Sequence, residues 1–199
     1  MIALPDPTIR EGTMKIIALD LSLSSTGFAR NYGEVRVGVL TPPKGHDRGV
    51  QRLDWIRGRV RELAQGANLA VIEGYSYGQQ RGSSLMHAMG ELGGVVRLAL
   101  YWLEVPFVEI APSTLKIIAT GSGRGDKNAM LAAAIRRLDY AGSNDNEADA
   151  LWLLEAASQH YGCSTIELPQ SHLRGLASIS WPRINGIGGS HALQEDQVP

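Results

Sequence analysis

The sequence is poor in several features that would otherwise decide its class. It holds 1 Cys in 199 residues, which excludes an intramolecular disulfide and fits a reducing compartment. No apolar run approaches the roughly 20 residues that span a bilayer, and the first residues lack the basic and apolar regions of a secretory signal. The net charge of −1 gives no overall sign of nucleic-acid binding. We therefore expect a cytoplasmic protein with no membrane partner.

The length and composition suit one folded domain with flanking segments. A hydrophobic content of 44% is ordinary for a globular protein and can fill one core. Residues 1–13 are expected to form a flexible leader, and residues 14–163 the folded domain. The stretch 164–199 contains Gly and Ser and shows no sustained hydrophobic period, so we expect a mostly disordered tail.

Hydrophobic patterns within 14–163 predict a mixed α/β domain. Strands are expected at 15–21, 26–31, 34–40, 69–73 and 106–110. Helices are expected at 47–64, at 83–103, from 112, at 126–138, and from a cap at Asn144 or Asp145 to about 161. The order βββαβαβαα predicts an antiparallel three-strand unit joined to parallel strands and flanked by helices.

Three acidic residues fall at the ends of elements that are otherwise apolar. Asp20 lies in an apolar strand, Glu73 closes Leu69–Glu73, and Asp149 lies at the start of the last helix. A buried carboxylate is costly unless a partner or a metal compensates it. Because hard cations such as Mg²⁺ bind carboxylate oxygens, these three acids predict a divalent-metal site.

Basic residues gather in two stretches despite the near-neutral total. Residues 44–62 hold six Lys or Arg against three acids, and residues 110–140 hold five against two. Local basic surfaces decide phosphate contacts more than net charge does. Either stretch is therefore a candidate surface for nucleic acid, and a solvated helix face is the alternative for each.

Four stretches taken together resemble one family. They are 17–29, with Asp20-Leu-Ser-Leu-Ser-Ser-Thr-Gly27, then 71–73, 111–127 and 147–151. In this order and spacing the chain resembles, from about Met14 to Tyr161, the RuvC family of Holliday-junction resolvases, of phage or bacterial type. The resemblance implies a ribonuclease H-like mixed five-stranded sheet, with 14–163 as the nuclease domain, in the cytoplasm of a bacterium or a phage-infected host.

The resemblance also implies roles for individual residues. Asp20, Glu73 and Asp149 would bind two Mg²⁺ ions, with Mn²⁺ as a substitute. The family has a further ligand, usually Asp or His, three residues before the last Asp, and this chain has Asn146 there. Asp145 or Glu147 could take its place, and helical spacing favours Asn146 or Asp145 over Glu147. The implied catalytic residues are Asp20, Glu73, Lys116, Asn146 and Asp149.

Contacts to DNA are implied for a second set of residues. Basic side chains would face the backbone or the scissile phosphate, and a tyrosine in the loop after Glu73 would stack on unpaired bases. The set is Tyr75, Tyr77, Arg81, Lys116, Arg124 and Lys127.

The sequence leaves three functions open. The first is a Mg²⁺-dependent endonuclease that resolves four-way or other branched DNA as a homodimer, with cleavage of RNA–DNA hybrids or flaps still open. The second is a branched-DNA binding module with weak or no cleavage, because Asn146 is not an acid. The third is an actin-like or sugar-kinase-like ATPase, because residues 20–27 resemble the first phosphate-binding loop of those proteins. The chain is too short for the two duplicated domains of that class, so we favour the first.

Overall fold

The computed structural model describes residues 14–74 and 83–184. Five strands form one mixed sheet in the order β3-β2-β1-β4-β5. Their bounds are β1 Ile16–Asp20, β2 Thr26–Arg30, β3 Arg36–Leu40, β4 Leu69–Glu73 and β5 Phe107–Ile110. The strands β1, β2 and β3 pair antiparallel, whereas β4 and β5 continue the sheet parallel to β1. This confirms the predicted antiparallel unit joined to parallel strands.

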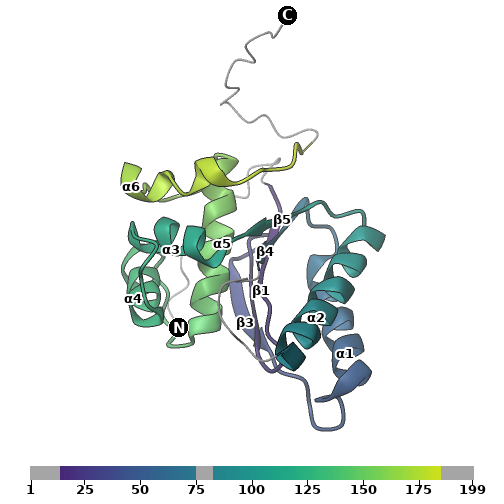
Figure 1. The fold of residues 1–199 in the computed structure, drawn as a ribbon. Helices are drawn as coiled ribbons and strands as arrows, with labels where there is room; N and C mark the ends of the chain where they lie inside the picture. Colours follow the sequence, from purple (N-terminus) through teal and green to yellow (C-terminus); the bar gives the residue numbers. More distant parts are fainter. Residues whose placement is uncertain (1–13, 75–82, 185–199) are drawn as a thin grey trace, which may run out of the picture.

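Helices cover both faces of the sheet (Figure 1). The helices α1 (Gly49–Ala64) and α2 (Ser83–Trp102) lie on one face. The other face carries α3 (Pro112–Thr120), α4 (Lys127–Arg137) and α5 (Asp145–His160). No helix in the described part of the chain is long and apolar enough to cross a membrane.

Strand β1 shows why two layers of helices are needed. All five of its residues are buried. Since successive side chains point to opposite faces, Ile16 and Ala18 join the core beneath α5, whereas Ile17 and Leu19 join the core beneath α1 and α2. An apolar strand that ends in an acid is thus fixed from both sides, and Asp20 has little freedom to move away from its position.

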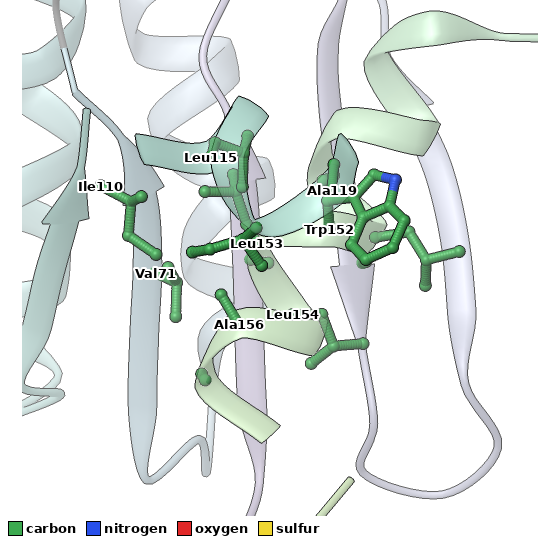
Figure 2. Packing of buried hydrophobic residues seen from close by; sticks show 14 of the residues in the cluster. Val71, Ile110, Leu115, Ala119, Trp152, Leu153, Leu154 and Ala156 are labelled. Carbon is green, nitrogen blue, oxygen red and sulfur yellow. The ribbon is translucent and has the colours of Figure 1, made fainter. Parts of the chain in front are cut away.

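The core beneath α5 is built around large apolar side chains (Figure 2). Trp152 and Leu153 of α5 are fully buried, and they pack with Val71 of β4 and Leu115 of α3. The indole N–H of Trp152 donates to the Met130 carbonyl oxygen at 3.2 Å, so this buried polar group is satisfied. The packing locks α5, α3 and α4 to the sheet as one body.

Helix ends follow local capping chemistry. The side chain of Asn144 accepts hydrogen bonds from the backbone N–H groups of Asn146 and Glu147, which confirms the cap expected at Asn144 or Asp145. Asp126 caps α4 in the same way through Ala129 N–H. These two caps set the start of α4 at Lys127 and the start of α5 at Asp145.

The described structure continues past residue 163, where we expected a mostly disordered tail. Helix α6 (Gln170–Leu173) and the short 3₁₀ turn Leu176–Ser178 pack against α3. The side chains of Leu168 and His172 are buried. The expectation of a tail therefore does not hold for residues 164–184, because long-range contacts order a segment that has no hydrophobic period. Residues 1–13 and 185–199 lie outside the described residues.

Candidate active site

Two of the predicted acids meet at the carboxyl edge of the sheet. Asp20 is the last residue of β1, and Glu73 is the last residue of β4. The two strands are parallel, with Leu19 opposite Ile72, so the next residue of each strand falls at the same level. Open α/β sheets bind their ligands at this edge, and parallel pairing alone brings these two carboxyl groups together.

The third acid reaches the same place from α5. Asp149 lies just after the first turn of a helix that packs on β1 and β2. It lines, with Asp20 and Glu73, a cavity of about 450 Å³ whose wall also includes Lys116, Lys127 and Asn146. The predicted acids therefore converge although they lie far apart along the chain.

The acids are held in a partly protonated state by their surroundings. Burial and the neighbouring Asp20 raise the pKa of Glu73 to about 9. Burial raises the pKa of the Asp20 carboxyl as well, although a hydrogen bond from Glu73 opposes the rise. Burial and the charge of Asp20 raise the pKa of Asp149 to about 7. Around neutral pH the site therefore holds more acid groups than its own cations can neutralise.

Within residues 14–74 and 83–184, no three Asp, Glu, His or Cys side chains are arranged as a ready-made set of metal ligands. The Asp20 and Glu73 carboxyl groups instead interact with each other, and the pair retains a proton because burial and their mutual repulsion disfavour two charges. A cation that binds here has to displace that proton, which couples its binding to pH.

Two lysines offset part of the negative charge. Lys116 of α3 lines the cavity and lowers the pKa values of Glu73 and Asp149. Lys127, the first residue of α4, also lines the cavity, and its ammonium group donates a hydrogen bond to Asp145. Arg124 is exposed on the link between α3 and α4 and is not part of the cavity wall.

The three candidates for the further ligand have separate surroundings. Asn146 lines the cavity, and its amide nitrogen donates to the Ser25 carbonyl oxygen at 3.0 Å and lies 3.1 Å from the Ser25 hydroxyl. Asp145 forms an ion pair with Lys127, which holds the pKa of Asp145 below its usual value. Glu147 accepts a hydrogen bond from the Tyr140 hydroxyl at 2.5 Å. Of the three, only Asn146 is part of the cavity wall.

Ser25 and Tyr140 hydrogen-bond the side chains of Asn146 and Glu147, and neither is predicted as a functional residue from the sequence. Only the serine-rich turn 22–25 pointed to Ser25. Tyr75, Tyr77 and Arg81 lie outside the described residues.

Known proteins match both the sequence and the fold. No family model matches the chain. A crossover junction endodeoxyribonuclease RuvC from Synechococcus sp. (strain RCC307) is 30% identical over 151 residues, which are 69% of this chain and 94% of the relative. The chain belongs to the RuvC family. A second RuvC, from Prochlorococcus marinus (strain MIT 9303), is 28% identical over 148 residues, with the same shares of 69% and 94%.

Solved structures of RuvC have the same fold. The Thermus thermophilus RuvC structure matches with a TM-score of 0.58 at 19% identity, over 77% of this chain and 100% of that chain. T. thermophilus RuvC in complex with a Holliday junction substrate matches with a TM-score of 0.59 at 18% identity, over 77% and 99%. The mixed five-stranded sheet is thus the ribonuclease H-like fold of RuvC, as the motifs predicted.

Proposed function

We propose that this protein is a structure-selective endonuclease that resolves Holliday junctions or other branched DNA by paired, symmetric hydrolysis of phosphodiesters. The observation that carries the proposal is the convergence of Asp20, Glu73 and Asp149 on one cavity beside Lys116 and Lys127, in a chain of the RuvC family. The nuclease domain would comprise residues 14–163, with residues 164–184 packed against it.

The donor chemistry of the cavity fits a hard divalent cation. Three carboxylates and one amide oxygen are oxygen ligands of the kind that Mg²⁺ prefers. Burial and neighbouring acids raise the pKa values of Glu73 and Asp149, so a divalent cation would stabilise their ionised forms. We propose Asp20, Glu73 and Asp149 as ligands of two Mg²⁺ ions, replaceable by Mn²⁺, with the Asn146 amide oxygen as a neutral fourth. Asp145 would remain paired with Lys127. When bound, such ions activate water and stabilise the leaving oxygen of a phosphodiester.

The basic side chains would bind and orient the DNA. We place Lys116 and Lys127 at the scissile phosphate, because both line the cavity that holds the acids. Arg124, exposed on the link between α3 and α4, would contact a flanking phosphate. Stacking by Tyr75 or Tyr77 and a backbone contact by Arg81 belong to the same proposal and depend on residues outside the described part of the chain.

A homodimer would give one active site for each strand that is cut. Helix α2 offers a surface for it, since Leu98, Tyr101 and Trp102 are 52%, 71% and 73% exposed. Gly90 and Gly94 lie on the same helix with no atom within 4 Å of an added Cβ, so a second backbone can approach closely. Replacement of Leu98 by Glu should therefore shift the protein to a monomer in sedimentation velocity.

The direct test is cleavage of a synthetic four-way junction with Mg²⁺, beside a linear duplex and an RNA–DNA hybrid. We expect paired symmetric nicks in the junction alone, and we expect Asp20→Asn to abolish them while it retains junction binding. Cleavage that continues at the wild-type rate in Asp20→Asn would refute the assignment of the site.

Asn146 favours one alternative function, a branched-DNA binding module with weak or no cleavage. An amide has no charge and cannot act as a base, so a site that lacks a fourth acid would bind DNA without cutting it. On this alternative, Asn146→Asp creates activity from near zero.

A further inference from the structure

The side chain of Asn146 is anchored to the turn between β1 and β2, whose residues 22–24 line the cavity. The Ser25 carbonyl oxygen can only accept a hydrogen bond, so the atom 3.0 Å from it is the amide nitrogen of Asn146. The Ser25 hydroxyl lies 3.1 Å from the same nitrogen. The two residues are 121 positions apart, and the bond therefore ties the start of α5 to the turn between β1 and β2.

The turn that receives this bond is itself well fixed. The buried Thr26 donates through its hydroxyl to the Ser22 carbonyl oxygen at 2.7 Å, and the Ser22 N–H donates back to that hydroxyl at 3.0 Å. Gly27 packs directly on the backbone of Asn146, where a Cβ would clash with the carbonyl oxygen. The Ser25 carbonyl is thus a rigid acceptor at a fixed distance from α5.

The anchor lies one helical turn before Asp149. Residues three apart on a helix share a face, so the turn that carries Asn146 also sets the direction of Asp149. Asp20 stands at the end of β1, immediately before the turn that holds Ser25. The Asn146–Ser25 bond therefore joins the turn that follows Asp20 to the helical turn that precedes Asp149, in addition to the core packing of α5.

Resting on the proposed function, we propose that Asn146, besides offering its amide oxygen to the cation, is a positioning residue whose amide nitrogen holds Asp149 against Asp20 and Glu73, so that an acid at this position would impair the site. A carboxylate has no N–H group and would face the Ser25 carbonyl oxygen with two acceptors. The repulsion between these acceptors at a part-buried site would shift the first turn of α5 locally, while the buried Trp152 and Leu153 keep the rest of the helix on the sheet. Asn146→Asp should therefore lower the cleavage activity, whereas it should raise the activity if residue 146 were a missing acidic ligand.

The test compares Asn146→Asp and Asn146→Ala with a matched control, Asn31→Asp. The Asn31 amide nitrogen donates to the Met14 carbonyl oxygen at 3.0 Å, so this control makes the same chemical change at the far end of β1. Two readouts are needed for each variant. One is the rate of junction cleavage per folded molecule as a function of Mg²⁺ concentration, and the other is the rise in melting temperature that Mg²⁺ or Mn²⁺ produces.

We expect Asn146→Asp and Asn146→Ala to lower the maximal rate roughly tenfold to a hundredfold, as for other residues that orient metal ligands. The melting-temperature rise with Mg²⁺ should shrink in both variants, whereas Asn31→Asp keeps the wild-type rise and the wild-type rate per folded molecule. Faster cleavage or a stronger response to Mg²⁺ in Asn146→Asp would overturn the proposal. An equal loss per folded molecule in Asn146→Asp and Asn31→Asp would also overturn it, since that is a general effect on folding.

Failure of the proposed function gives a different result. If the wild-type protein cuts no junction under any condition, the endonuclease is refuted, but the melting-temperature readout still applies. A Mg²⁺-induced rise that is present in the wild type and lost in Asn146→Asp supports the positioning role. A rise that persists in Asn146→Asp refutes it.

Discussion

Replacement of Glu73 by Gln should stabilise the metal-free protein above neutral pH while it abolishes cleavage. The folded pKa of Glu73 is about 9, above its ordinary value of 4.5, because burial and Asp20 disfavour the charged form. Between these values the folded state keeps a proton that the unfolded state has lost. The free energy of unfolding therefore falls as pH rises through this window. Gln has no proton to lose, and its amide can still donate to Asp20.

The size of the effect follows from the shift in pKa. Each unit of difference corresponds to about 1.4 kcal/mol, so a group that titrates near 4.5 when unfolded loses at most about 5 kcal/mol by about pH 8. The cavity is open to solvent on one side, and water there screens the carboxyl groups, so we expect about 2 kcal/mol. The gain of Glu73→Gln over wild type should be near zero at about pH 5 and should grow steadily with pH.

Urea unfolding in EDTA at several pH values measures this difference. Glu62→Gln is the matched control, because its carboxylate lies on the exposed face of α1 and its loss should change stability by less than about 0.5 kcal/mol. Added Mg²⁺ should restore wild-type stability at high pH and should act weakly on Glu73→Gln. The reasoning is refuted if Glu73→Gln follows the wild-type pH dependence, or if it destabilises the metal-free protein at about pH 8.

Three further predictions concern the DNA contact, the turn and the C-terminal segment. Lys127→Ala should weaken junction binding equally for all sequences and reduce the salt slope of the affinity by about 1, measured by fluorescence anisotropy. Gly27→Ala should lower the free energy of unfolding by about 3 kcal/mol in urea, because the added Cβ clashes with the Asn146 carbonyl. Trp181→Ala should cost about 2 kcal/mol in the same assay, because Trp181 stacks on His160 with ring centroids 4.5 Å apart.

Much of the fold could be predicted because its signals are local. The strand that ends at Asp20 is apolar and short, the caps at Asp126 and Asn144 are side chains that hydrogen-bond within one turn, and the order of elements limits the sheet to few topologies. Two of the three acids could be predicted to converge from the strand order. Parallel strands bring Asp20 and Glu73 to one edge whatever the loops between them do.

Helix α6 could not be predicted because its stability comes from distant partners. It has four residues, too few for a hydrophobic period, and isolated helices of that length do not form in water. His172 hydrogen-bonds through Nδ1 to the Ile118 carbonyl oxygen at 2.8 Å, and Arg174 donates to the Gly121 carbonyl oxygen at 2.9 Å. Both acceptors lie at the end of α3 or in its cap, so the order of this segment depends on contacts with that helix.

The start of α5 shows why neighbouring candidates could not be separated by sequence alone. Successive residues of a helix turn by about 100°, so three adjacent polar side chains meet three different environments. Asp145 faces Lys127 of α4, Asn146 faces Ser25 of the turn after β1, and Glu147 faces Tyr140. Each partner lies on a different part of the chain, and each suits the side chain that it meets. Of these three side chains, only the amide of Asn146 can donate to the Ser25 carbonyl oxygen at any pH. The surroundings of residue 146 therefore include a partner 121 residues away, which a comparison with acidic ligands at the same spacing cannot reveal.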